Sequence, residues 1–259
     1  MDNINTLNNV ELEVNDICFS YHSRQNEIKA LDHISFSVEK GEFIAIVGPS
    51  GCGKSTLLNI ICGLLLPESG QVTFPNGDNT CIGYMLQHDH LFEWRSVYDN
   101  LILGLEIQGK KNAETIGSVL EMAELYGLSA FLAKKPSELS GGMRQRAALI
   151  RTLALNPSLL LLDEPFSALD YQTRLNVSSD IGALIRKTHK TAILVTHNLS
   201  EAISMADHII VLSRRPSKIR REFDIHLTVS DDDSLLAYRN APEFQKLFNL
   251  IWEELIDDK

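Results

Sequence analysis

Residues 48–55, with the sequence GPSGCGKS, match the phosphate-binding pattern G-x-x-x-x-G-K-[ST] at every position. The run Phe43–Val47 before them is typical of a buried strand, and Thr56–Cys62 after them is typical of a helix. A glycine-rich loop in this context can point its backbone N–H groups inward and bind anions. Lys54 can then reach the outer phosphates of a nucleotide, and the Ser55 hydroxyl can bind Mg²⁺. The context favours nucleotide binding over the alternative, a plain glycine turn.

Composition and charge narrow the class of protein. The 259 residues are 44% apolar and 22% charged, as in an ordinary folded protein, and the net charge is −10. This balance argues against nucleic-acid binding and against direct adhesion to anionic lipid. The apolar runs are too short to cross a bilayer, and the N-terminus shows no secretory signal. The cysteines are scattered, which predicts reduced thiols in a cytoplasm: Cys18, Cys52, Cys62 and Cys81.

Two kinds of strand pattern are visible. Apolar residues alternate near the N-terminus at Val10, Leu12, Val14, Ile17, Phe19 and Tyr21, and again at Ile34, Phe36 and Val38. This period of two predicts half-buried antiparallel strands. Later runs are continuously apolar, at Leu159–Leu162, Ala192–Val195 and Ile209–Leu212. Such runs predict parallel strands with helices on both faces.

Helical spacing marks two further regions. Between about residues 88 and 157, the segments Val97–Leu105, Ala113–Tyr126 and Gly142–Leu155 are typical of helices, which predicts a helical insert in the α/β core. The tail predicts a helix with one apolar face, formed by Phe244, Leu247, Phe248, Ile251, Trp252 and Leu255. Because its other face is acidic, we expect this helix to dock on the body of the protein rather than in a membrane.

Two acids end the apolar run Leu159–Leu162. A buried strand would deliver Asp163 and Glu164 to the carboxyl edge of the sheet, where ligands bind in open α/β folds. Asp163 is then placed to hold Mg²⁺ through water, and Glu164 to orient or deprotonate an attacking water. A strand that merely ends in acids is the alternative, and the phosphate loop upstream favours the catalytic interpretation.

A second glycine motif opens the helix after residue 139. Ser140, Gly141 and Gly142 would place free N–H donors at a helix N-terminus, which makes a second anion site. One ATP does not readily need both sites in one subunit, so we infer a head-to-tail pair of chains with each ATP between them. The alternative is a serine N-cap followed by flexible glycines.

Together these motifs resemble the ATP-binding subunit of ATP-binding-cassette (ABC) transporters, over about residues 10–222. The resemblance implies an α/β P-loop NTPase fold with a mainly parallel sheet, an N-terminal antiparallel β subdomain and a helical subdomain at about 88–157. Residues 223–259 would form a short helical extension. It also implies an ATPase that uses ATP and Mg²⁺ and pairs with a second copy of itself.

The same resemblance assigns roles to individual residues. Nucleotide contacts fall on Tyr21, Gly48, Pro49, Ser50, Gly51, Cys52, Gly53, Lys54, Ser55, Thr56, Ser140, Gly141, Gly142 and Asp170. Catalytic roles fall on Lys54, Gln87, Glu164 and His197, and Mg²⁺ ligation on Ser55, Gln87 and Asp163. Tyr21 would stack on adenine, and His197 would lie near the γ-phosphate. Taken alone, Tyr21 could be a half-buried strand residue, Gln87 a surface glutamine and His197 a structural histidine.

A finer resemblance concerns residues 91–100. Their L-x-x-W-R-x-V-x-x-N pattern resembles the corresponding stretch in the ATP-binding subunits of importers for nitrate, sulfonate, taurine and related solutes. Glu93 stands where that group often has proline. It implies a peripheral subunit on the cytoplasmic face of the cell membrane. A permease would dock near Gln87, Phe92 and Trp94, with an extracytoplasmic solute-binding protein in the complex. The alternatives are a non-transport ABC ATPase and an export-type cassette, and no residue identifies the solute.

Overall fold

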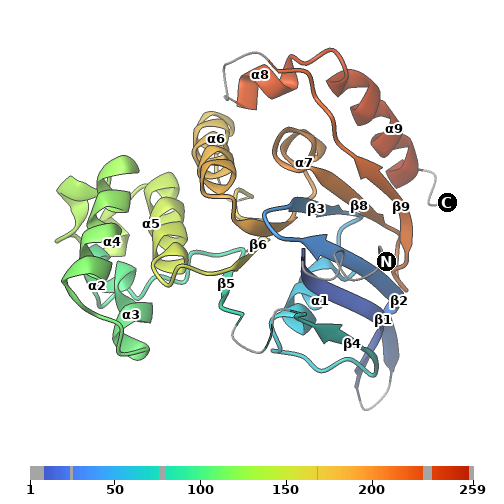
Figure 1. Ribbon diagram of the computed structural model, residues 1–259, viewed down its shortest axis with the longest axis horizontal. Coiled ribbons are helices and arrows are strands. Elements are labelled where there is room, and N and C mark those ends of the chain that lie inside the picture. Colours follow the sequence, from blue (N-terminus) through green and yellow to red (C-terminus); the bar gives the residue numbers. More distant parts are fainter. Residues whose placement is uncertain are drawn as a thin grey trace, which may run out of the picture. The chain divides into compact units, whose positions relative to one another are not determined.

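The computed structural model describes residues 9–23, 26–75, 77, 80–167, 169–229 and 235–256. By their contacts these residues divide into two units. Unit 1 contains the described residues up to Thr80 and from Gly182 onward, and unit 2 contains those from Cys81 to Ile181. Figure 1 labels most of the helices and strands of both units.

An antiparallel sheet begins unit 1. β1 (Val10–His22) lies between β2 (Glu27–Glu39) and β4 (Ser69–Thr73) and pairs with both in the antiparallel sense, as predicted. The pairing of β1 with β2 shifts register on both sides of Ile17, so the buried side chains that follow are Cys18 and Ser20. The strict alternation predicted through Tyr21 is therefore wrong at this end of the strand. The Tyr21 side chain is 45% exposed.

Parallel strands form the centre of unit 1. β3 (Phe43–Val47) lies between β7 (Thr191–Val195) and β8 (His208–Leu212) and runs parallel to both. β9 (Ile219–Asp224) pairs with β8 in the antiparallel sense at the edge. Every residue of β3 and β7 is buried, which is the burial expected of strands covered on both faces. The continuously apolar runs thus form parallel strands, as predicted.

The helices of unit 1 include the predicted tail helix. They are α1 (Lys54–Ile61), α7 (Leu199–Met205), α8 (Leu235–Arg239) and α9 (Phe244–Ile256), and α6 (Tyr171–Thr188) begins in unit 2 and ends in unit 1. α9, drawn in red in Figure 1, packs against α7 and β8 and buries Ile251 completely. The apolar face of the tail therefore contacts the body of unit 1, although Trp252 stays half-exposed.

Unit 2 combines two parallel strands with the predicted helical insert. β5 (Ile82–Met85) pairs with β6 (Leu159–Asp163). The helices are α2 (Val97–Leu101), α3 (Leu103–Ile107), α4 (Ala113–Leu125) and α5 (Gly141–Leu153), with short 3-10 turns η1 (Ser129–Phe131) and η2 (Pro136–Glu138). α5 packs against β5 and against the other three helices, and its inner face is buried at Ala147 and Ile150. The α/β class predicted from the sequence is confirmed.

Candidate functional site

The phosphate loop connects β3 to α1 in unit 1, as the pattern predicts. Gly53 has φ +117°, and a Cβ there would lie 2.9 Å from Cδ2 of Leu31. A Cβ on Gly48 would lie 3.0 Å from both the Cys52 sulfur and the Leu212 carbonyl oxygen. Glycine is needed at residue 53 because its backbone is left-handed, and at residue 48 a side chain would press on Cys52 and Leu212. The loop therefore curls tightly in front of the N-terminus of α1.

Lys54 is folded back into this loop. Its Nζ donates hydrogen bonds to the carbonyl oxygens of Gly48 (2.8 Å) and Pro49 (3.1 Å), and the residue is 5% exposed. Ser50, Gly51 and Ser55 form the exposed side of the loop. A buried ammonium beside the N-terminus of a helix favours an anion on that exposed side. The loop thus has the shape and charge that a nucleotide phosphate requires.

Tyr21 is fixed next to the same helix. Its hydroxyl lies 2.9 Å from Oγ1 of Thr56, and its ring meets that of Phe19 edge-to-face with centroids 5.0 Å apart. Because the hydroxyl and one ring edge are held, a half-exposed ring face stays available for stacking on a base.

His197 follows β7, the strand that runs parallel to β3 in unit 1. The carboxyl ends of these neighbouring strands lead into His197 and Gly48, so the histidine and the phosphate loop emerge from the same edge of the sheet. The His197 side chain is exposed. Unit 1 therefore brings together the phosphate loop, Tyr21 and His197.

A buried polar network fixes the turn that carries His197, and the sequence analysis missed it. Thr196 Oγ1 donates to Glu201 (3.0 Å), and Asn198 Nδ2 donates to the other Glu201 oxygen (3.0 Å). The Asn198 side chain also accepts N–H groups at the start of α7. Asn198 and Glu201 have the spacing of a capping motif, which could have revealed the turn.

The phosphate loop has a second support that no local signal indicates. Ser217 is completely buried, and its hydroxyl shares its single proton between two carbonyl oxygens, that of Cys52 and that of Ser213 at 3.0 Å. Its backbone also bonds to Ala30 and Asp32 in β2. Because these partners are far apart in the sequence, only the fold shows that Ser217 holds the loop.

In unit 2 the ends of β5 and β6 bring three of the predicted residues close together. Met85 pairs with Leu162, so the residues after each strand leave the same edge of the sheet. Gln87 Nε2 donates to Glu164 Oε2 at 3.4 Å, and the Tyr84 hydroxyl donates to Asp163 Oδ2 at the same distance. Asp163 is 6% exposed. The predicted Mg²⁺ ligands Gln87 and Asp163 thus flank the predicted base Glu164.

The backbone at Glu164 is unusual. Its φ is +44°, which is uncommon outside glycine, and its carbonyl accepts hydrogen bonds from the N–H and the hydroxyl of Ser167. Arg174 donates to the carbonyls of Phe166 (3.1 Å) and Leu169 (2.7 Å) and so holds the following turn. Strained positions of this kind are often found at functional sites. Ala168 lies outside the described residues.

Ser140, Gly141 and Gly142 begin α5 as predicted. The Ser140 hydroxyl accepts the Met143 N–H (3.4 Å), so Ser140 is the N-cap. Ser140 and Gly141 are exposed, whereas Gly142 is buried where a Cβ would collide with Cγ2 of Thr173. This helix N-terminus therefore faces solvent at its first residues, and a side chain at the third position would require Thr173 to move.

Asp170 caps α6. Its Oδ1 accepts the N–H groups of Gln172 and Thr173, each at 3.1 Å. These hydrogen bonds, those of Thr173 first, hold the pKa of Asp170 below its usual value. Asp170 is thus an exposed, ionised residue in a fixed orientation.

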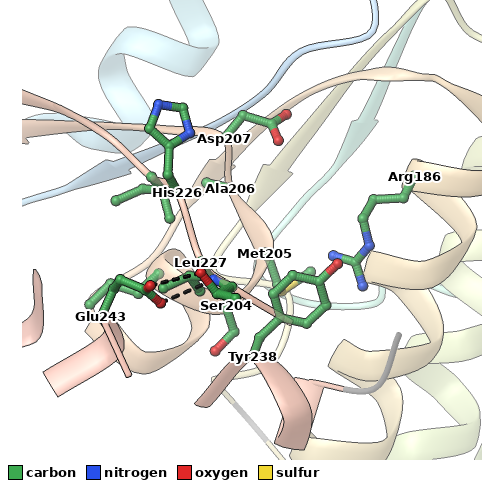
Figure 2. Close-up of a pocket in the computed structure, with 12 residues that line it drawn as sticks. Arg186, Ser204, Met205, Ala206, Asp207, His226, Leu227, Tyr238 and Glu243 are labelled. Carbon is green, nitrogen blue, oxygen red and sulfur yellow. Dashed lines mark hydrogen bonds between the residues drawn. The ribbon is translucent and has the colours of Figure 1, made fainter. Parts of the chain in front are cut away.

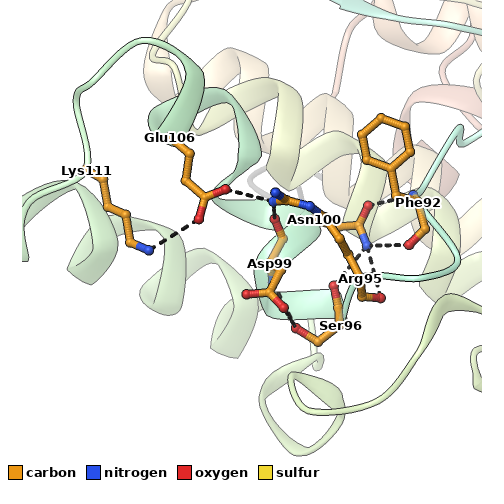
Figure 3. A network of polar contacts seen from close by, with 7 residues as sticks. All are labelled: Phe92, Arg95, Ser96, Asp99, Asn100, Glu106 and Lys111. Carbon is orange, nitrogen blue, oxygen red and sulfur yellow. Dashed lines mark hydrogen bonds and ion pairs between the residues drawn. The ribbon is translucent and has the colours of Figure 1, made fainter.

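A segment rich in exposed aromatic side chains precedes α2 in unit 2. The Phe92 and Trp94 rings stack with centroids 4.6 Å apart, and Trp94 is 72% exposed. Figure 3 shows how this segment is held: buried Asn100 accepts the Phe92 N–H and donates to the Phe92 and Ser96 carbonyls. Arg95 bonds to Glu106 at 2.7 Å. A rigid base thus presents two apolar rings to solvent.

Two other features of unit 1 lie apart from these residues. A cavity of about 500 Å³ opens beside α7 and α8, where Arg186 covers the Tyr238 ring at 4.6 Å and Thr228 bonds to Glu243 (Figure 2). None of the predicted site residues lines it.

Among the described residues, Cys18, Asp32 and His33 bring possible metal ligands within 4.8 Å of one another. Lys29 and Lys218 already bind that aspartate, and their charges oppose a cation.

Comparisons with known proteins place these residues in a family. The family model described as "ABC transporter" matches residues 31–167. The uncharacterized ABC transporter ATP-binding protein YtlC of Bacillus subtilis (strain 168) is 46% identical, over 94% of this chain and 95% of its own. The taurine import ATP-binding protein TauB of Roseobacter denitrificans is 35% identical over 93% and 94%. The nitrate import ATP-binding protein NrtD of Synechocystis sp. is 36% identical over 92% of each.

A solved structure of an ATP-binding cassette is also similar to this chain. The ATP-binding cassette MJ0796, in a dimeric post-hydrolysis state bound to ADP and Pi, matches with a TM-score of 0.70 and 31% identity. The match covers 83% of this chain and 99% of that one. Within the described residues of our chain, none of the helices has the length and apolar character needed to span a bilayer. The chain therefore belongs to the ABC transporter family and is one of its ATP-binding subunits, which are ATPases coupled to transport.

Proposed function

We propose that this subunit energises a membrane permease for the import of a small solute, of the nitrate, sulfonate or taurine type or a related nitrogen or sulfur compound. The observation that carries the proposal is the 3.4 Å contact between Gln87 and Glu164, because it joins a residue near the expected permease surface to the predicted base. Relatives named for taurine and nitrate import, at 35% and 36% identity over most of the chain, support the solute class.

The proposed chemistry is phosphoryl transfer to water. Lys54 and the backbone N–H groups of residues 50–56 would bind and neutralise the phosphates, while the Tyr21 ring would stack on the adenine. Glu164 would orient or deprotonate the attacking water, and His197 would contact the γ-phosphate. Phosphoryl transfer needs positioning and charge neutralisation more than covalent catalysis, which suits these fixed side chains.

The oxygen ligands present fit Mg²⁺. A serine hydroxyl, a glutamine amide and a buried carboxylate are ligand types that Mg²⁺ accepts alongside water and phosphate oxygens. Ser55, Gln87 and Asp163 would hold the ion. When bound, Mg²⁺ would neutralise negative charge on the phosphate groups.

Two copies of the chain would close around two ATP molecules. The N-terminus of α5, with exposed Ser140 and Gly141 and buried Gly142, would complete the phosphate site of the partner copy, and Asp170 would lie at the interface. The dimeric cassette MJ0796 with ADP and Pi supports this arrangement. Closure would favour ATP over ADP, and that difference in affinity would drive the transport cycle.

The permease would dock near Gln87, Phe92 and Trp94. Exposed stacked rings on a rigid base suit a cytoplasmic helix of a membrane protein, since aromatic side chains contribute much of the energy of protein interfaces. We propose that the subunit is peripheral on the cytoplasmic face of the cell membrane, with an extracytoplasmic solute-binding protein in the complex. The net charge of −10 supports a protein partner rather than nucleic acid.

We also propose the domain organisation given by the motifs. Residues 10–222 would form the ABC ATPase domain, with a helical subdomain at about 88–157, and residues 223–259 a short C-terminal extension. The helices of unit 2 between residues 97 and 153 support the first division, and the packing of α9 on α7 is compatible with an extension that docks on the domain.

Affinity capture tests this function. Tagged Glu164→Gln protein, which should bind ATP but not hydrolyse it, is incubated with detergent-solubilised native membranes and Mg-ATP, and bound proteins are identified by mass spectrometry. The matched control adds Lys54→Ala to the same variant, which should remove ATP-dependent capture. Recovery of a multi-span permease with a solute-binding protein supports import. Recovery of an exporter, of ribosomes or of DNA-associated proteins, without such a permease, would overturn it.

A further inference from the structure

One arginine of α5 links the helix to the segment that carries Phe92 and Trp94. The guanidinium of Arg144 donates to both carboxylate oxygens of Asp89, at 2.9 Å and 3.1 Å, and lies 2.8 Å from the Glu93 carboxylate. A planar guanidinium suits such multiple contacts, because its N–H groups point in fixed directions. We call Asp89, Glu93 and Arg144 the arginine clamp.

A second arginine of α5 reinforces the contact. Arg151 donates to the carbonyl oxygens of Asp89 and His90, each at 2.7 Å. On its other side the segment is held by Asn100 and Arg95, as Figure 3 shows. Residues 89–95 therefore contact α5 on one side and the α2 and α3 region on the other, without a helix or strand of their own.

The electrostatics of the clamp favour its charged form. Burial opposes the ionisation of Asp89, but Arg144 and the Leu91 N–H outweigh it, so the pKa of Asp89 lies below its usual value. The hydrogen bond with Asp89 likewise raises the pKa of Arg144. The pair is therefore ionised at neutral pH, and Glu93 adds a second carboxylate at the more exposed end.

The clamp touches both functional surfaces of unit 2. Arg144 lies on the first turn of α5, where its N–H bonds to the Ser140 carbonyl at 3.0 Å. Glu93 lies between Phe92 and Trp94, and its side chain is 50% exposed, against 18% for Asp89. A partner that covers the aromatic rings would reach Glu93 first, while Asp89 would keep the arginine ionised and in place.

We propose that the clamp transmits permease binding at Phe92 and Trp94 to the N-terminus of α5 and so controls how Ser140 is presented to the partner copy. This inference rests on the proposed function. Arg144 acts through Ser140 and is a positioning residue. When a partner draws Glu93 away, Arg144 bonds to Asp89 alone, and the first turn of α5 gains freedom to move.

The first part of the test uses the isolated chain. Amide hydrogen exchange is measured at Met143 and Arg144, whose N–H groups bond to Ser140. Glu93→Gln should raise their exchange rate roughly two- to fivefold, the range expected from losing one partly exposed ion pair. The matched control is Glu121→Gln, the same change on an exposed position of α4, which should leave these rates unchanged. Equal rates in both variants would overturn the proposal.

The second part uses the complex with the captured permease, reconstituted in lipid vesicles. At equal amounts of bound permease, Glu93→Gln should lower the ratio of the ATPase rate of the complex to that of the isolated chain by roughly threefold or more. Glu93→Asp, which keeps the carboxylate, should restore part of that loss. A ratio in Glu93→Gln equal to that of the wild type would overturn the transmission role.

The two parts separate two kinds of failure. If no permease is captured by the Glu164→Gln protein, the proposed function is wrong and the transmission role is wrong with it. Exchange at Met143 and Arg144 then still reports whether the clamp holds the first turn of α5. If a permease is captured but Glu93→Gln behaves as the wild type, only the clamp proposal fails.

Discussion

The hydroxyl of Tyr21 lies 2.9 Å from Oγ1 of Thr56, although the two residues are 35 positions apart in the chain. Thr56 ends the proposed nucleotide loop and is 7% exposed, whereas Tyr21 keeps a half-exposed ring. The contact fixes the tilt of that ring relative to α1. Tyr21 can therefore serve in two ways, as a stacking surface through its ring and as a support for the loop through its hydroxyl.

Substitutions at Tyr21 should separate these roles. Tyr21→Phe keeps the ring and removes the contact with Thr56, so we expect Mg-ATP affinity within roughly threefold of the parent, the effect of one modest hydrogen bond. Tyr21→Leu also removes the ring and should weaken binding about tenfold. Calorimetry on the non-hydrolysing Glu164→Gln background measures both. Tyr171→Leu, at a tyrosine that is 70% exposed on α6, is the control. Equal losses in the Phe and Leu variants would show that the hydroxyl, not the ring, matters.

Trp94→Ala tests the proposed permease surface. Because Trp94 is 72% exposed and is not one of the proposed nucleotide residues, the ATPase rate of the isolated chain should stay within about twofold of wild type. Recovery of permease should fall at least tenfold, as expected for an aromatic interface residue. Trp252→Ala, which removes a half-exposed tryptophan from α9, is the matched control. If Trp94→Ala recovers as much permease as the wild type, the permease does not dock on the surface that contains Trp94.

The environment of Tyr126 leads us to predict that the free energy of unfolding falls at alkaline pH. Burial, aided by the Asp180 carboxylate, raises the pKa of Tyr126 to about 12, from an ordinary value near 10. Between these values the unfolded chain releases the phenol proton and the native chain retains it, so the native state loses stability as pH rises. The loss should reach about 1.4 kcal/mol near pH 11.

Urea unfolding at pH 9 and pH 11 measures this loss. The Tyr126→Phe variant lacks the phenol and should show a smaller decrease than the wild type by about that amount, because all other groups titrate alike. Parallel decreases in the two proteins would mean that the Tyr126 phenol ionises as freely in the native chain as in the unfolded one.

The elements around the phosphate loop were predictable because their signals are local. The buried run Phe43–Val47 and the glycines that follow specify a strand, a tight loop and a helix within twenty residues. The run ending in Asp163 and Glu164 is equally local. The burial of Tyr21 could not be predicted in this way. The register shifts around Ile17 change which side chains face the core, and the apolar alternation in β1 does not indicate where a bulge lies.

Contacts between distant segments were not predictable in this way. Ser217 supports Cys52 across 165 positions, and Arg144 reaches Asp89 across 55. A single sequence carries no pattern that pairs such residues, since each is an ordinary serine, arginine or aspartate until the chain folds. The Asn198–Glu201 turn differs, because its capping spacing is local and could have been recognised.

Gly142 offers a test of the second glycine motif through packing alone. A Cβ at this buried position would collide with Cγ2 of Thr173 on α6. Gly142→Ala should therefore lower the free energy of unfolding by about 1–3 kcal/mol, the usual effect of overpacking a well-filled site. Thr173→Ser deletes the methyl group concerned, and the double variant should recover most of the loss.

The control is Gly117→Ala, at a helical glycine whose Cβ would meet open space, and this change should be neutral or slightly stabilising. Urea unfolding of these variants measures the coupling. If the double variant were no more stable than Gly142→Ala, the need for glycine would come from the backbone at the start of α5 rather than from Thr173.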